Sequence, residues 1–232
     1  MELIVSAALL GIFCVAAIAL VRPCAQIFLE IQNLARAQMI ADTVVEKLRG
    51  ELLHAQGALR FADVGADGTA VFDRSADRTQ GDAVEFLTPS GYFVLLDAGA
   101  LPPMRLDAPT DGAEQEESPA RPAGTLHLRY YRPTADGSSP RGYSYRRGGD
   151  YTAYDCTQAY ADRFYMGNEV SLHFAVQGMQ QTDNADAAPP RVTSLHLTVA
   201  IRRAGTVLYT REAILDLVDA PTLRWDAVGT AD

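Results

Sequence analysis

Four histidines, His54, His127, His173 and His196, are the side chains best suited to bind a metal ion or carry a proton near neutral pH. His173 and His196 each follow a Ser-Leu pair in a β-prone segment. If these segments form neighbouring strands, both rings lie on one wet face, and two imidazoles could begin a zinc site. A tetrahedral site needs further ligands, and no Cys or His spacing supplies them. We therefore expect surface histidines, no metal site and no cofactor.

Cys156 is the candidate nucleophile, because a cysteine beside a histidine can carry out covalent catalysis. Its surroundings, Tyr154-Asp155-Cys156-Thr157, match no local signature of a cysteine enzyme. The sequence also lacks a Walker-type loop and a Rossmann glycine pattern. We expect no catalytic residue and no enzyme. The other cysteines, Cys14 and Cys24, lie near the N-terminus, so Cys156 is predicted to be a buried free thiol, the alternative being pairing between molecules.

Tyrosines are concentrated in one part of the chain, since eight of ten fall between Tyr130 and Tyr165. Rigid aromatic rings beside a glycine-rich backbone make good contact surfaces at low entropy cost. Tyr143, Tyr145 and Tyr151 form our candidate contact patch. The competing interpretation is that these rings fill the edges of a small core.

The composition places these residues in a chain that folds. Of 232 residues, 48% are hydrophobic and 21% charged, which suits one domain with an appendage. The formal net charge is −9. Because phosphate backbones are bound through Lys and Arg, we expect no nucleic-acid partner.

The N-terminal segment decides the class of protein. Leu3 to Val21 is a run of nineteen residues without a charge, closed by Arg22 and preceded by Glu2. As a helix it is about 28 Å long, close to the hydrocarbon thickness of a bilayer. The basic start and small-x-small cleavage site of a secretory signal are missing from this run. The pattern predicts a single membrane-spanning helix.

The first residues resemble the start of mature type IV pilins and pseudopilins, in which a glutamate precedes an apolar helix. The resemblance implies that Glu2 pairs with the N-terminal amine of a neighbouring subunit during filament assembly. It also implies that a prepilin peptidase removes a basic leader; none precedes Glu2 in this sequence, so processing requires a leader encoded upstream of Met1. The implied partners are other pilin-like subunits and membrane lipid. The residues of the membrane and filament helix are Leu3, Ile4, Val5, Leu9, Leu10, Ile12 and Phe13.

The helix is predicted to continue past a kink at Pro23 as an amphipathic half and to end at Gln56, before Gly57. Lys47 and Glu51 are spaced for an i, i+4 ion pair. The apolar positions expected to face the head are Ile27, Ile31, Leu34, Ala41, Val45, Leu48 and Leu52.

After Gly57, short β-prone segments predict an antiparallel sheet lying on the helix, which gives an α+β fold. Hairpin turns are expected at Asp67-Gly68 and Ala204-Gly205. The expected strands are 58–64, 69–73, 83–88, 92–96, 125–132, 169–177, 192–202 and 206–217. The expected divisions are a membrane half (1–23), an amphipathic half (24–57), a β head (58–220) with loops at 102–124, 134–154 and 180–191, and a tail (221–232).

These observations predict a minor pilin or pseudopilin that assembles through its N-terminal helix, in a pilus, a competence system or a secretion pseudopilus. The protein is expected in the cell membrane as a single-pass protein with its head outside the cytoplasm, or in a surface filament. The alternative is a solitary single-pass protein whose head binds a cell-wall or protein ligand.

Overall fold

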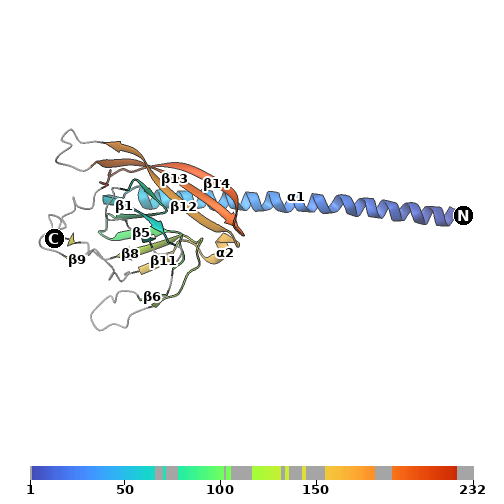
Figure 1. Ribbon diagram of the computed structural model, residues 1–232, viewed down its shortest axis with the longest axis horizontal. Helices are drawn as coiled ribbons and strands as arrows, with labels where there is room; N and C mark the ends of the chain where they lie inside the picture. Colours follow the sequence, from blue (N-terminus) through green and yellow to red (C-terminus); the bar gives the residue numbers. More distant parts are fainter. Residues whose placement is uncertain are drawn as a thin grey trace.

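The computed structural model describes residues 2–65, 70–71, 78–101, 103–105, 117–131, 134–135, 143–144, 155–180 and 190–223, some of them, such as Glu2, Tyr143 and Cys156, by their backbone alone. One long helix, α1 (Glu2–Leu52, 51 residues), projects from a head made of antiparallel β-sheets (Figure 1). This α+β arrangement is the one predicted.

Helix α1 runs unbroken through Pro23 and ends earlier than predicted. Its last turn is closed by the Leu53 N–H donating to the Arg49 carbonyl at 3.0 Å, and strand β1 already begins at Gln56. The predicted helix end at Gln56 is therefore wrong by four residues. The predicted ion pair is present, with 2.6 Å between Lys47 Nζ and Glu51 Oε1.

The packed face of α1 starts at Ala37, later than the amphipathic pattern predicted. Ile27, Ile31 and Leu34 were expected to face the head, yet their side chains are exposed. The buried residues of α1 are Ala37, Ile40, Ala41, Val44, Val45, Leu48 and Leu52.

Two main sheets pack around this half of the helix, where one was expected. The first, called sheet A here, has the order β11-β8-β5-β4-β1-β2, with all neighbours antiparallel. Its strands are β1 (Gln56–Val64), β2 (Ala70–Val71), β4 (Ala83–Leu87), β5 (Phe93–Asp97), β8 (His127–Tyr131) and β11 (Asp155–Gln158).

The second sheet, called sheet B here, has the order β14-β13-β12-β3. The predicted alternation in β13 is confirmed, because Leu195, Leu197, Val199 and Ile201 are all fully buried. The strands are β3 (Gln80–Gly81), β12 (Glu169–Gln180), β13 (Arg191–Arg203) and β14 (Thr206–Asp216).

The predicted hairpin turn between β13 and β14 is also confirmed. Arg203 pairs with Thr206, which leaves Ala204 and Gly205 as a two-residue loop with φ of 48° and 79°. Positive φ at both positions is the geometry of a type I′ turn, which matches the twist of the flanking strands. The turn predicted at Asp67-Gly68 lies outside the described residues.

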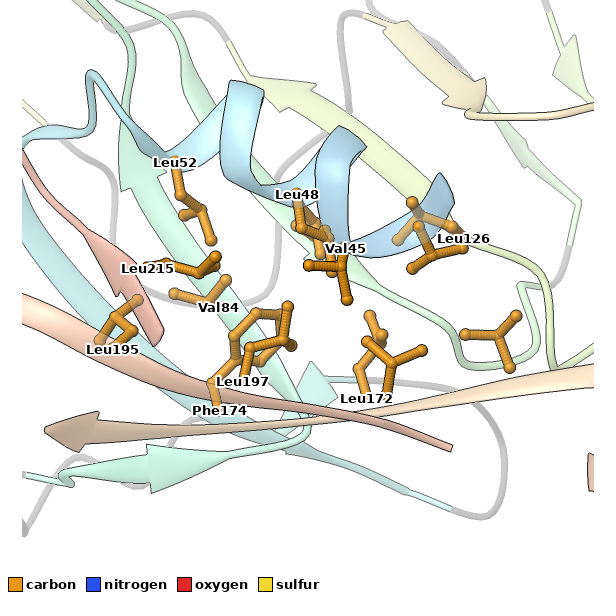
Figure 2. Packing of buried hydrophobic residues seen from close by; sticks show 14 of the residues in the cluster. Val45, Leu48, Leu52, Val84, Leu126, Leu172, Phe174, Leu195, Leu197 and Leu215 are labelled. Atoms are coloured by element: carbon orange, nitrogen blue, oxygen red, sulfur yellow. The ribbon is translucent and has the colours of Figure 1, made fainter. Parts of the chain in front are cut away.

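The core lies where α1 meets the two sheets (Figure 2). Leu48 and Leu52 from the helix pack with Val84 of β4 and with Leu197 and Leu215 of sheet B, and Figure 2 shows these side chains converging. Burying a leucine in this way stabilises the fold by about 1.5–3 kcal/mol. The second half of the helix is thus a central element of the head.

Three predicted loops are partly structured. The predicted loop 102–124 includes β6 (Met104–Arg105) paired with β7 (Glu117–Ser118). The predicted loop 134–154 includes β9 (Thr134–Ala135) paired with β10 (Tyr143–Ser144). The predicted loop 180–191 is shorter at both ends, since β12 includes Gln180 and β13 starts at Arg191.

The chain after β14 also joins the head. Thr222, in the predicted tail, pairs with Arg191, and its N–H donates to the Gly57 carbonyl at 2.7 Å. Leu223 is buried in the core. A short helix, α2 (Asp162–Tyr165), follows β11, and neither element was expected from the sequence.

Candidate functional site

The first half of α1 exposes apolar side chains on all its sides. Ile4, Phe13 and Ile18 are each at least 70% exposed, and none of the most apolar window is covered by the rest of the chain. The helix is long and apolar enough to cross a membrane, by length and composition, although a signal sequence has the same properties. The predicted helix residues Val5, Leu9, Leu10 and Ile12 are likewise exposed.

Glu2 is the first residue of α1, so it lies at the end where the helix dipole is positive. A carboxylate is favourable there even without a partner. Only the backbone of Glu2 and Leu3 is described, so the pairing of Glu2 with a neighbouring amine stays a prediction.

The exposed apolar surface continues beyond the predicted membrane span. Ile27, Phe28, Leu29 and Ile31 are each at least 55% exposed, in the stretch between Arg22 and the head. Sequence reasoning assigned Ile27 and Ile31 to the packed face and gave Phe28 and Leu29 no role. The sequence from Ile27 to Ile31 could have indicated this exposure. Apolar residues occupy four of its five positions, which does not fit a helix with a single apolar face. This stretch, Ile27 to Ile31, is called the bare segment below.

The bare segment ends where sheet B begins to contact the helix. The Arg203 guanidinium, next to the β13–β14 turn, donates to Asn33 Oδ1 at 2.9 Å. Farther along, Arg211 of β14 lies 3.4 Å from Asp42, and the Val218 N–H donates to the Leu53 carbonyl at 3.0 Å. The β13–β14 hairpin therefore contacts α1 at Asn33 and Asp42, and the chain after β14 bonds to Leu53, just past the end of the helix.

Sheet A carries a group of buried polar residues on the face opposite the helix, which we call the buried polar cluster: Glu85, Asp97, His127 and Arg129. The register explains why they meet, because Glu85 lies opposite Leu95, Leu95 opposite Arg129, and Asp97 opposite His127. Arg129 forms an ion pair with Asp97, whose Oδ1 also accepts from the Gly99 N–H at 3.0 Å.

His127 corrects the expectation that all four histidines lie at the surface, because it is fully buried. Its Nε2 lies 2.9 Å from Thr125 Oγ1, while Nδ1 has no hydrogen-bond partner among the described residues. Burial lowers the pKa of His127 below its ordinary value, an effect that Asp97 opposes and that Arg121 and Arg129 reinforce. The folded head therefore favours the neutral form of this ring.

Two of the clustered tyrosines pack inside the head. The Tyr165 hydroxyl accepts from the Leu126 N–H at 3.0 Å, and burial raises the pKa of Tyr165 to about 12. The Tyr160 ring stacks on Phe164 with 4.3 Å between centroids, and its hydroxyl donates to the Thr43 carbonyl at 3.3 Å. These two contacts favour the core interpretation for this pair.

The candidate contact patch is placed only in part. The backbone of Tyr143 belongs to β10, whereas Tyr145 and Tyr151 lie outside the described residues. The structure therefore does not test the patch.

The remaining histidines and cysteines fall in separate places. His54 is exposed just after the helix, and His173 and His196 lie on neighbouring strands of sheet B, as the sequence allowed. Cys14 and Cys24 are exposed free thiols on α1, and Cys156 lies opposite Arg129 in β11. In the described part of the chain, no set of three or more His, Cys, Asp or Glu side chains is arranged around a metal position.

Comparisons with protein-family models, with curated proteins and with solved structures give no match. What the structure establishes is an architecture, in which a long helix with an apolar, uncovered start packs its second half against antiparallel sheets. This is a pilin-like arrangement.

Proposed function

We propose that the protein is a structural subunit, a minor pilin or pseudopilin, that assembles into a type IV pilus-like or secretion-like filament through the first half of α1. Its head carries out no catalysis in this proposal and lies outside the cytoplasm. The observation that supports the proposal most is the uncovered apolar surface, which runs from Ile4 through the bare segment to Ile31.

The length of that surface argues for a protein partner in addition to lipid. Apolar surface left in water costs about 25 cal/mol per Å². A bilayer accounts for about 20 residues of helix, enough to cover the run from Leu3 to Val21 but not the bare segment beyond Arg22. Equivalent helices of neighbouring subunits would cover both parts when they pack side by side. A simple tether has no need of exposed Phe28 and Leu29.

Site-specific crosslinking in cells tests this packing. A photoreactive residue in place of Phe28 should crosslink to other membrane proteins with pilin-like N-termini or to copies of this chain. The same probe at Glu46, on the exposed side of the packed half of the helix, is the matched control and should crosslink much less. Crosslinks at Phe28 to lipid alone would support the solitary single-pass alternative and would refute assembly.

Glu2 supplies a second test. Glu2→Ala should leave membrane insertion unchanged and should abolish incorporation into filaments, because an uncompensated amine would remain in the apolar bundle. Incorporation is measured by the amount of the chain in sheared filament fractions. Glu2→Asp, which keeps the charge, is the control and should assemble better than Glu2→Ala. Equal filament yield from all three chains would remove Glu2 from the mechanism.

A further inference from the structure

The face of sheet B that points away from the helix carries two histidines on adjacent strands. In β13, Leu195, Leu197 and Val199 point into the core, so His196 and Thr198 between them lie on the opposite face. His173 of β12 pairs directly with Thr198, which places it on that same face. Ala175 pairs with His196, so the two imidazoles are diagonal neighbours across the β12–β13 pair.

Each of these imidazoles faces a carboxylate from the strand on its outer side. His173 Nδ1 lies 3.0 Å from Asp82 Oδ1, next to β3, and His196 Nε2 lies 3.7 Å from Glu212 Oε2 of β14. The order across the face is therefore Asp82, His173, His196, Glu212. In each ring one nitrogen is directed to a carboxylate, and the second nitrogen makes no hydrogen bond or ion pair with the described residues.

The pairing of each imidazole with a carboxylate is also common at protein-bound transition metals. A metal-binding histidine usually donates its second ring N–H to a carboxylate, which fixes the tautomer and makes the ligating nitrogen more basic. Diagonal positions on antiparallel strands are about 7–8 Å apart, within reach of long side chains. Two imidazoles in this relation would bind one ion at about 2.0–2.1 Å each once the rings turn toward one another.

We propose that His173 and His196 form a surface site for a divalent transition metal ion of the Zn²⁺ and Cu²⁺ class, with Asp82 and Glu212 orienting the two rings. Imidazole is a favourable ligand for both ions. The site supplies two protein nitrogens, and water fills the remaining positions, which accords with the lack of a set of three protein ligands in the described residues.

The surroundings favour a cation over a packing contact. On the β14 side His196 is paired with the exposed Ile214, whereas the neighbours between the two rings, Ala175, Thr198 and Ala200, are small and leave room for an ion with its waters. The acidic excess of the chain, a net charge of −9, also attracts cations. The site lies on the face of sheet B that points away from α1, so the proposal does not rest on filament assembly.

Calorimetric titration of the full-length protein in detergent with Zn²⁺ tests the proposal. The protein carries a purification tag without histidine, and Cys14, Cys24 and Cys156 are replaced by serine, because thiolates bind zinc. The expected result is one saturable site. His173→Gln and His196→Gln should each raise the Kd for Zn²⁺ at least about tenfold, and Asp82→Asn should also weaken binding, as loss of an orienting carboxylate usually does.

His54→Gln is the matched control, because His54 is exposed and lies just after α1, outside the strands of sheet B. It should leave the Kd unchanged. The ring signals of His173 and His196 should shift together in a ¹⁵N spectrum at one equivalent of Zn²⁺. The melting temperature of each variant without metal should equal that of the parent, which separates loss of the site from loss of the fold.

Two results would overturn the proposal: no saturable binding by the parent, or unchanged binding by the His173→Gln, His196→Gln double variant. In either case the two rings are surface partners of Asp82 and Glu212 and nothing more.

Discussion

The two halves of α1 share one continuous backbone and have opposite surroundings. From Ile4 to Leu34 the large apolar side chains are exposed, whereas from Ala37 to Leu52 the buried apolar side chains fill the centre of a two-sheet head. The same residue type therefore has two different roles in one helix. Leu20 is 68% exposed and Leu48 is fully buried, so the first is available to lipid or a partner and the second stabilises the fold. Apolar composition alone does not separate these roles.

The largest effect on stability is expected outside the helix, in the buried polar cluster. Among the described residues, Arg129→Met leaves the buried Asp97 carboxylate with one hydrogen-bond donor, the Gly99 N–H. Removing one partner of a buried ion pair usually costs about 3–5 kcal/mol. Urea unfolding of the head followed by circular dichroism measures this loss, and the Asp97→Asn, Arg129→Met double variant should recover part of it. Equal stability of parent and single variant would mean that the pair contributes little.

The comparison of the helix halves is tested directly by two leucines. Leu48→Ala should destabilise the head by about 2–5 kcal/mol, because it leaves a cavity where helix and sheets meet. Leu20→Ala removes the same atoms from an uncovered position and should change the unfolding free energy by less than about 0.5 kcal/mol. Both are measured by urea unfolding in the same detergent. A similar loss from both would break the distinction between the halves.

A pH titration sharpens the contrast between buried and exposed histidines. The pKa of His127 is lower in the folded head than in the unfolded chain, so the unfolded chain binds more protons below its own pKa of about 6.5. The neutral His127 ring therefore contributes its full share of the unfolding free energy above that pH, and this share is lost as the pH falls further. The charge of Asp97 raises the pKa of this ring, whereas the charges of Arg121 and Arg129 lower it. Stability measured at pH 8 and pH 5 should fall less in His127→Gln than in the parent, while His54→Gln, at an exposed site, should behave as the parent does.

The smallest effect on stability is expected at the turn of the β13–β14 hairpin, which packs against α1. Ala204 has a φ of 48°. This left-handed backbone conformation costs about 1 kcal/mol for any residue that has a Cβ atom. Ala204→Gly should relieve this strain and raise the unfolding free energy by up to about 1 kcal/mol, as measured from the urea midpoint. Ala200→Gly, in the middle of β13, is the control and should lower stability.

The sequence predicted the long helix, the α+β class and most strands because these depend on local patterns. The alternation from Leu195 to Ile201 and the Ala204-Gly205 turn are examples, and both are confirmed. The division of the head into two sheets could not be predicted, because it depends on which strands pair across the chain. For the same reason, the place of β11 as an edge strand of sheet A could not be predicted.

The candidate sites divide in the same way. The uncovered apolar run was visible in the sequence, since length and the absence of charge define it. The burial of His127 was not, because it follows from strand register and from what covers the second face of sheet A. For His173 and His196, the repeated Ser-Leu-His pattern predicted a shared face. Their carboxylate partners, Asp82 and Glu212, lie in distant parts of the sequence and could not be predicted from residue spacing.

The contact between Arg203 and Asn33 sets how near the head can come to a membrane. If Val21 lies at the outer surface of a bilayer, the twelve residues from there to Asn33 hold the lower rim of the head about 18 Å away, at about 1.5 Å of helix per residue. A gap of that height is wide enough for bare helices of several chains to converge beneath bulky heads. Such a gap would let neighbouring subunits contact each other through the exposed part of α1 before their heads come into contact.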